Sequence, residues 1–302
     1  MNIARLFNDF KTQDDCIKHL ELVRWNNKPV CPYCKSTKSS KFKGSRYYTC
    51  LNNKCGNSYS VTVGTLFHDS KIGLQKWFLA ISLILNAKKG ISACQLMRDL
   101  DIGSYKTAWR MLKLIRKAMV DNDMRGYFTN IVEMDETYIG GKPPKFPGKV
   151  NLAKRGRGTK KQPVIGVMDR DNKKVYAKVA TVDKDGRKLS GKQLMEVLEE
   201  VCINKPIALM TDEFTGYSSF KSKGYNHKVV DHSKQFTKGF THTNTIESFW
   251  AILKRGVYGI YHKISAKYLQ QYINEFCFRY NNRDETIAFD SIVLNATLLS
   301  SH

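Results

Sequence analysis

The chain has 302 residues and carries 50 lysines and arginines against 27 aspartates and glutamates, a formal net charge of +23. The basic residues are spread along the whole chain, which excludes a lone basic tail and favours nucleic acid as the partner. No apolar run reaches the roughly 18 residues that span a bilayer, and the N-terminus has no apolar signal core, so we expect neither membrane insertion nor secretion. Eight cysteines without an export signal favour metal ligands and buried thiols over disulfides. Four of them stand alone in predicted helices and are interpreted as core residues: Cys16, Cys94, Cys202 and Cys277.

The first predicted region, residues 1–69, combines a helix with a zinc ribbon. The helix spans 1–28, and its apolar side is formed by Ile17, Leu20, Leu22 and Trp25. Two close cysteine pairs follow, one C-x2-C and one C-x4-C, separated by fifteen residues: Cys31, Cys34, Cys50 and Cys55. Such pairs, with β-forming residues at 47–49 and 59–63, are typical of a ribbon that wraps one tetrahedral Zn²⁺. Two unrelated pairs of free thiols are the alternative, and they would not explain the spacing and the strands together.

Residues 70–126 are predicted to form a helical, helix-turn-helix-like DNA-binding region. One helix covers 74–86 and ends at a Lys-Lys-Gly stop, a second covers 92–100, and a third opens at Ser104 after a Gly-containing turn. The third helix is basic, and its Lys106 and Arg110 are predicted DNA contacts. Its other basic residues are Lys113, Arg116 and Lys117. A plain three-helix spacer is an equal alternative, because amphipathic helical pairs are common.

Residues 127–302 change to a pattern of strands and helices. Three strands are followed by a helix, a strand, a short helix, a strand and two more helices. The predicted segments are 128–135, 163–170, 173–180, 190–201, 207–211, 217–221, 227–232, a helix opening at 244, and 267–280. This succession is that of the ribonuclease H-like α/β fold, so the whole chain is expected to be a multidomain α+β protein.

A block with eight lysines and arginines and no acid covers residues 142–161. Proline and glycine interrupt it, so we expect a loop without a regular scaffold. Such a loop is predicted to contact DNA phosphates without reading sequence. The DNA contacts assigned to it are Lys154, Arg155 and Arg157.

Three carboxylates fall at corresponding points of the predicted fold. Asp135 ends the first strand, Asp212 follows the fourth, and Glu247 lies on the helix after the fifth. Because the first and fourth strands are neighbours in this fold and the helix crosses beside them, we predict that the three acids converge. Clustered like charges are costly unless cations neutralise them, and carboxylate oxygens suit Mg²⁺ or Mn²⁺. A strand-end cap is the simpler interpretation for any single aspartate, but the trio favours a two-metal site for phosphodiester chemistry.

The helix that carries Glu247 is predicted to begin at an Asn244 cap. Lys254 lies seven residues after Glu247, nearly two turns, and therefore on the same side of the helix. We predict that Lys254 binds the DNA backbone close to the cut, with Arg255 as a further contact. The apolar face of this helix, interpreted as core, is formed by Ile246, Phe249, Trp250 and Leu253.

Other polar residues flank the predicted site. Strand alternation is expected to turn Glu133, Glu136 and Glu213 to the face away from the aspartates. His242 is either a phosphate contact near the helix N-terminus or a hydrogen-bonded structural residue. Two arginines are open between DNA contact and simple solvation: Arg279 and Arg283.

Four stretches make the sequence recognisable: VEMDETYIGGK, TDEFTGY, HTNTIESFWAILKRGVYGIYHKIS and YLQQYINEFCFRYNNR. Together they resemble the Merlin-type group of DDE transposases, which includes insertion-sequence enzymes with an N-terminal zinc ribbon and an ISXO2-like catalytic domain. The resemblance covers roughly residues 10–290. It implies that Asp135, Asp212 and Glu247 form the acidic triad and that Lys254 is the basic residue after it. Some relatives are described as having Asn in the third position, where this chain has Glu247.

The resemblance implies a DNA transposase that binds its element's terminal inverted repeats, hydrolyses phosphodiesters with Mg²⁺ or Mn²⁺, and uses the freed 3′-OH to attack target DNA. It further implies double-stranded DNA as partner, a homo-oligomer in the DNA complex, and a cytoplasmic, nucleoid-associated location if the source is bacterial. Two alternatives stay open. A zinc-ribbon regulator without catalysis explains residues 1–120 but not the acids, and another ribonuclease H-like nuclease or resolvase keeps the chemistry with a different substrate.

Overall fold

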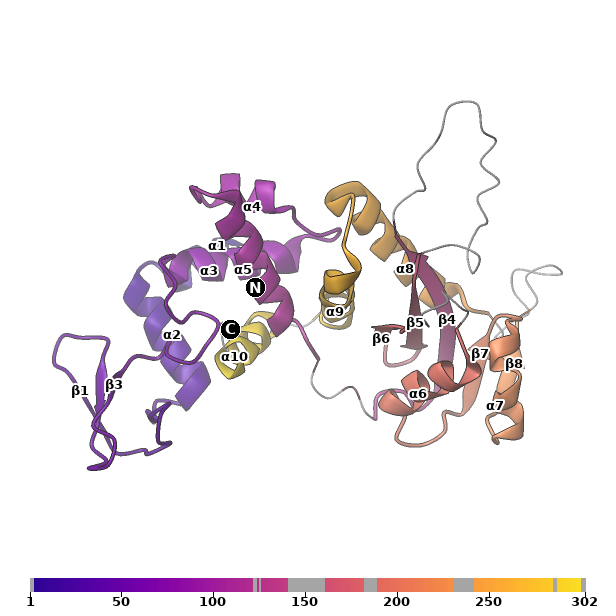
Figure 1. Cartoon of the computed structure of the whole chain (residues 1–302), viewed down its shortest axis with the longest axis horizontal. Coiled ribbons are helices and arrows are strands. Elements are labelled where there is room, and N and C mark those ends of the chain that lie inside the picture. The colour runs from indigo at the N-terminus through magenta and orange to yellow at the C-terminus, as the bar shows by residue number, and fades with distance from the viewer. Residues whose placement is uncertain are drawn as a thin grey trace. The chain divides into compact units, whose positions relative to one another are not determined.

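The computed structural model describes residues 3–121, 124, 126–140, 161–181, 189–230, 242–284 and 287–299 (Figure 1). The chain forms two compact units. The first combines the chain before Asp121 with the segment from Arg283 onward, and the second runs from Asp121 to Asn282. The predicted basic loop, apart from Lys161, lies outside the described residues.

The N-terminal segment of the first unit forms two helices, α1 (Ile3–Asp9) and α2 (Gln13–Trp25), so the prediction of one helix was wrong. The cause is a capping box: the Thr12 hydroxyl accepts a hydrogen bond from the Asp15 amide at 3.2 Å, and the Asp15 carboxylate accepts one from the Thr12 amide at 2.8 Å. Leu22 was also misplaced, because 47% of its surface is exposed.

The zinc ribbon forms a small antiparallel sheet in the order β1-β2-β3. Its strands are β1 (Ser39–Lys41), β2 (Tyr48–Cys50) and β3 (Ser58–Tyr59). Tyr48 and Tyr59 stack with ring centroids 5.8 Å apart, and Trp25 of α2 meets both edge-on. Aromatic packing therefore joins the ribbon to the preceding helix.

Three helices follow in the first unit: α3 (Leu74–Asn86), α4 (Ala93–Asp99) and α5 (Tyr105–Ala118). The bounds of α3 and the start of α5 match the prediction, and α4 is one residue shorter at each end than the predicted 92–100. Of the three N-cap residues only Ser92 caps with its side chain: its hydroxyl accepts from the Gln95 amide at 3.1 Å. Lys106 and Arg110 are exposed on α5. Arg116, one of the other basic residues of this helix, is only 2% exposed and is therefore a buried residue.

A last helix, α10 (Ala288–Leu298), also packs in the first unit, although the sequence grouped its residues with the domain that begins at 127. The Asn295 side chain donates to the Ala118 carbonyl at 2.9 Å, and the Leu66 amide donates to the Ala296 carbonyl at 3.0 Å. The Phe289 ring meets Phe78 edge-on at 5.4 Å. The buried face of α10 therefore completes the N-terminal core.

The second unit is built on a five-stranded sheet in the order β6-β5-β4-β7-β8. The strands are β4 (Ile131–Ile139), β5 (Gln162–Asp169), β6 (Lys174–Val179), β7 (Ala208–Thr211) and β8 (His227–Val229). The first three pair antiparallel, while β7 and β8 run parallel to β4. In sequence order this is 3-2-1-4-5, the predicted ribonuclease H-like arrangement.

Helices cover both faces of this sheet (Figure 1). On one face lie α6 (Gly191–Val201), the 3-10 turn η2 (Thr215–Tyr217) and α7 (Ser219–Ser222). On the other lie α8 (Asn244–Gly256), its π-helical extension η3 (Val257–Tyr261) and α9 (Ala266–Asn281). Alternate residues of β5 enter the two cores, Ile165 and Val167 the first, Val164 and Met168 the second.

No helix among the described residues has the length and apolar character needed to cross a membrane. Of the four cysteines predicted to be core residues, Cys16 and Cys277 are buried and Cys202 is half-buried. Cys94 is exposed, so that prediction was wrong: it faces outward on α4, whose buried positions are Ala93 and Leu96.

Candidate active site

Asp135 and Asp212 lie side by side because β4 and β7 are parallel neighbours. Glu133 pairs with Met210, and the same register continued by two residues brings Asp135 level with Asp212. The expectation that Asp135 ends its strand was wrong, since β4 continues to Ile139 through its antiparallel pairing with β5. Only β7 stops here, so Asp135 sits where one neighbouring strand has ended.

The carboxylates of Asp135, Glu136 and Asp212 form a cluster. Each offers one oxygen, and the three oxygens lie within 4.8 Å of one another. Alternation does turn Glu136 toward the α6 face, where the Tyr217 hydroxyl donates to its Oε2 at 3.0 Å. The predicted face of Glu136 is therefore correct, but its carboxylate still reaches the aspartates around the edge left by β7. Glu213, which follows Asp212, is exposed.

Burial makes ionisation of this cluster unfavourable. Burial raises the pKa of Asp135 to about 7, and the negative charges of Glu136 and Asp212 add to the effect. The Asp212 carboxylate is fixed by the Phe214 amide, which donates to Oδ1 at 3.0 Å. Three hard oxygen donors with an unfavourable mutual charge are a donor set suited to a divalent cation such as Mg²⁺ or Mn²⁺.

Trp250 of α8 holds Asp135 in place. Its indole Nε1 donates to Asp135 Oδ2 at 3.0 Å, while the ring is only 3% exposed. The indole reaches Asp135 by lying over Gly166, the residue of β5 that pairs with Asp135 of β4. A Cβ at Gly166 would stand 2.5 Å from Trp250 Cζ2, so only glycine leaves room for the ring. Trp250 is therefore a core residue, as predicted, and it also supports the Asp135 carboxylate. The sequence signal for this contact was Gly166, because a glycine inside a strand often marks the close approach of another group.

Glu247 occupies the first turn of α8 but does not belong to the cluster of carboxylates that the described residues form. Its Oε1 accepts a hydrogen bond from the Thr243 hydroxyl at 2.8 Å, and the side chain is exposed. Thr243, rather than Asn244, is the N-cap residue, so that assignment was wrong by one position. Lys254 is half-buried in the last turn, followed by the exposed Arg255.

Glu133 lies on the same face as Asp135, because residues two apart on a strand point the same way. The expectation that it turns away was therefore wrong. Glu133 is fully buried and its carboxylate meets the Arg170 guanidinium and the Ile246 amide. His242 Nδ1 lies 3.0 Å from Arg170 Nη2 and 3.5 Å from Glu133 Oε1, which favours the structural interpretation of this histidine.

Arg279 fits neither interpretation made from the sequence. Its side chain is 7% exposed, and Nη2 lies 2.9 Å from Oε1 of the fully buried Glu275 one turn earlier on α9. Tyr261, at the end of η3, donates to the same carboxylate at 2.8 Å. This buried ion pair joins η3 to α9.

The four predicted zinc ligands of the ribbon also come together. Their sulfur atoms lie within 4.8 Å of one another: Cys31, Cys34, Cys50 and Cys55. Two Sγ···Sγ distances are 3.5 and 3.8 Å, and a tetrahedron with Zn–S bonds of about 2.3 Å requires separations of about 3.8 Å. The side-chain amides of Asn52 and Asn57 donate to two of the sulfurs, as the outer shell of a thiolate site requires. The donor set therefore fits one Zn²⁺.

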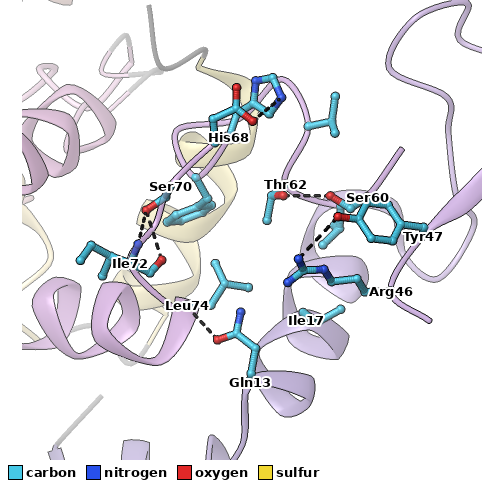
Figure 2. A pocket seen from close by; sticks show the side chains of 14 residues that line it. Gln13, Ile17, Arg46, Tyr47, Ser60, Thr62, His68, Ser70, Ile72 and Leu74 are labelled. Atoms are coloured by element: carbon cyan, nitrogen blue, oxygen red, sulfur yellow. Dashed lines mark hydrogen bonds and ion pairs between the residues drawn. The ribbon is translucent and has the colours of Figure 1, made fainter. Parts of the chain in front are cut away.

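A cavity of about 230 Å³ lies elsewhere, between the ribbon and the helices of the first unit (Figure 2). Arg46 and Tyr47 line it from the ribbon, and Gln13 lines it from α2, where its Oε1 accepts from the Leu74 amide at 2.9 Å. No residue of the carboxylate cluster lines this cavity.

The sheet order and the carboxylates beside β4 and β7 define a ribonuclease H-like protein with an acidic site, preceded by a four-cysteine ribbon. The profile of the ISXO2-like transposase domain matches residues 127–281, more than half of the chain. The chain therefore belongs to this transposase family. The transposase zinc-ribbon domain matches residues 11–58.

A protein of the transposable element ISH50 from Halobacterium salinarum is 27% identical over 274 residues, which cover 86% of this chain and 88% of that protein. The simian T-cell lymphotropic virus intasome in complex with PP2A regulatory subunit B56 gamma gives 13% identity, 64% and 66% coverage, and a TM-score of 0.31. The Mos1 transposase paired-end complex gives 12% identity, 72% and 78% coverage, and a TM-score of 0.28. TM-scores this low do not establish a common fold, so the fold assignment rests on the strand order.

Proposed function

We propose that this protein is a DNA transposase that binds the terminal inverted repeats of its element and catalyses strand cleavage and strand transfer. The observation that carries the proposal is that the carboxylates of Asp135 and Asp212 lie close together beside two parallel neighbouring strands of a ribonuclease H-like sheet, in a chain of a transposase family. In cleavage, water adds to phosphorus, one P–O bond breaks, and a 3′-OH is released. In transfer, that 3′-OH attacks a target phosphodiester, so one P–O bond again forms as another breaks.

The residues divide this work by position. Asp135, fixed by Trp250, and Asp212, fixed by the Phe214 amide, present oxygens toward one point. Glu247 approaches from α8 as the third acid of the family pattern. Mg²⁺ or Mn²⁺ bound by these carboxylates would supply activation of the attacking oxygen and stabilisation of the leaving one. Lys254 binds the phosphate backbone beside the acids, because helical spacing places it on Glu247's side.

DNA binding is assigned to both units. Lys106 and Arg110 are exposed on α5, the second helix of the helix-turn-helix-like pair, where basic side chains reach a groove or its phosphates. The basic loop, with Lys154, Arg155 and Arg157, and Arg255 on α8 add contacts to phosphates near the cut. Two inverted repeats are brought together by two copies of the chain, so we propose a homo-oligomer in the complex, acting in a cytoplasmic nucleoid if the source is bacterial.

The test is incubation of the zinc-loaded full chain with duplex DNA carrying the element's native flanks and Mg²⁺, followed by mapping of cut positions. We expect cutting at the element ends by the wild type and not by Asp212→Asn. Glu213→Gln is the matched control, since it removes the neighbouring charge outside the cluster and should cut normally. A wild type that binds ends and never cuts would favour the non-catalytic regulator, and cutting without preference for ends would favour a general nuclease.

A further inference from the structure

We propose that Glu133 and Arg170 are positioning residues of the acidic site, which rests on the proposed function above. Together they fasten the N-terminus of α8 to β4, and so fix Glu247 and Trp250 relative to Asp135. Neither residue is part of the acidic triad that the sequence pattern indicates. Glu133 lies on β4 and Arg170 on the turn directly after β5, whereas the segment they hold is the start of α8.

Glu133 supplies a cap that α8 lacks locally. The side chain of the N-cap residue Thr243 makes no capping hydrogen bond to the helix amides; its hydroxyl donates to the Glu247 carboxylate. Glu133 Oε2 accepts from the amide of Ile246, in the first turn of α8, at 2.8 Å. A buried carboxylate at a helix N-terminus also meets the positive end of the helix dipole. A strand residue two positions from Asp135 therefore caps the helix that carries Glu247.

Arg170 completes the clamp from the other side. Its Nε donates to Glu133 Oε1, and its Nη2 donates to the His242 carbonyl and lies 3.0 Å from His242 Nδ1. The planar guanidinium thus joins the carboxylate on β4 to the backbone just before α8, which a lysine ammonium cannot do with the same geometry. The pair is buried, with 0% of the Glu133 and 12% of the Arg170 side chain exposed.

The turn that carries Arg170 is itself rigidly held. Asp169 is fully buried; its Oδ2 accepts from the Thr129 and Asn130 amides at 3.1 and 3.3 Å, and its Oδ1 accepts from the Asn172 amide at 2.8 Å. The Arg170 amide donates to the Ile131 carbonyl at 3.1 Å. The clamp therefore ties α8 to a fixed point of the sheet.

The consequence reaches the acids through the helix. Ile246 precedes Glu247 directly, and Trp250, which donates to Asp135, follows one turn later. Release of the clamp should let the first turn of α8 shift, so that Glu247 and the Trp250–Asp135 bond move together. Interactions of this supporting kind change metal affinity or activity by about 10–100-fold when they are removed.

The test uses Glu133→Gln, Arg170→Met and Arg170→Lys in the full chain. Both carboxylate oxygens of Glu133 accept hydrogen bonds, one from Arg170 and one from the Ile246 amide. The side-chain NH₂ of Gln can only donate, so Glu133→Gln must lose one of these two bonds. We measure Mn²⁺ binding by electron paramagnetic resonance, the single-turnover cleavage rate at saturating DNA, the Kd for the element ends and Tm. We expect Mn²⁺ affinity or the cleavage rate to fall about 10–100-fold while the Kd for the element ends is unchanged. The loss should be smaller in Arg170→Lys than in Arg170→Met. The double variant Glu133→Gln/Arg170→Met should be no worse than either single variant, because the two residues act together.

Glu275→Gln is the matched control, since it breaks an equally buried Glu–Arg pair of the same unit that does not touch the N-terminus of α8. It should lower Tm while leaving Mn²⁺ affinity and cleavage within about twofold of wild type. If Glu133→Gln and Arg170→Lys behave like this control and change only Tm, the clamp is structural and the inference is wrong. Failure of the proposed function would be distinguishable from failure of this inference. If the wild type never cuts DNA, the effect of the Glu133 and Arg170 variants on Mn²⁺ binding still tests the clamp.

Discussion

The two candidate metal sites of this chain are built in opposite ways. The four ribbon cysteines come from one short segment, and their sulfurs are surrounded by turns and by two asparagine amides. The clustered acids come from β4 and from the residue after β7, and they are held by contacts between segments far apart in sequence, such as that from Trp250 of α8 to Asp135. We therefore expect the first site to depend on its metal for its shape, and the second to be shaped by the folded protein alone.

This difference predicts how each site responds to damage. A site that the fold supports should keep its folded structure when one ligand is replaced, and lose only its catalytic activity. A site that the metal supports should lose its shape.

The largest effect should come from the acids. Asp135→Asn and Asp212→Asn keep the side-chain shape and remove a charge from a crowded cluster, so the far-UV circular dichroism and Tm should not fall. Strand cleavage of an end-bearing duplex should fall by orders of magnitude. The double variant should cut little worse than either single variant, because residues that act as a unit are not additive. Substantial cutting by Asp212→Asn would contradict the assignment.

Removal of zinc should have the next largest effect, and it should act on structure. A strong chelator should unfold the ribbon and leave the second unit folded, which limited proteolysis of residues 28–60 would detect. Cys34→Ser should reproduce this loss, because a structural zinc site contributes folding free energy directly. Cys94→Ser is the control, since this exposed cysteine lies outside the cluster. Purified protein without zinc and with an intact ribbon would overturn the contrast between the two sites.

The same contrast explains how far the sequence could predict the molecule. The convergence of the four ribbon cysteines, the bounds of α3 and the start of α5 after Ser104 follow from signals within a few residues, and they were predicted. The strand order followed from the succession of elements. The clamp on Glu133 was missed, because a carboxylate beside Asp135 reveals nothing of Arg170 until β5 is paired with β4. The length of β4 was missed for the same reason, since pairing decides where a strand ends.

Gly166→Ala should disturb the acid site without changing any of its acids. The added Cβ would stand 2.5–2.6 Å from the Trp250 ring, so the indole or β5 must move. Overpacking of this kind typically lowers stability by about 1–3 kcal/mol, and the shifted indole should loosen its bond to Asp135 and slow cleavage. Thermal unfolding and single-turnover cleavage measure the two effects. Gly259→Ala in the same unit is the control, because nothing lies within 4 Å of its added Cβ.

Lys254→Ala should give the smallest change in stability and a moderate change in activity. Lys254 is half-buried in the last turn of α8, and seven residues of helix place it about 10 Å along the axis from Glu247. A hydrogen bond to a charged phosphate contributes about 1.5–3 kcal/mol, so cleavage should fall about tenfold or more while Tm stays nearly constant. Lys254→Arg should retain most of the activity, and the exposed Lys267→Ala should change neither quantity. The salt dependence of end binding separates a phosphate contact from a structural role for Lys254. Loss of a phosphate contact reduces the slope of log K against log salt concentration by about one. A heat-sensitive Lys254→Ala protein with an unchanged slope would make Lys254 a structural residue.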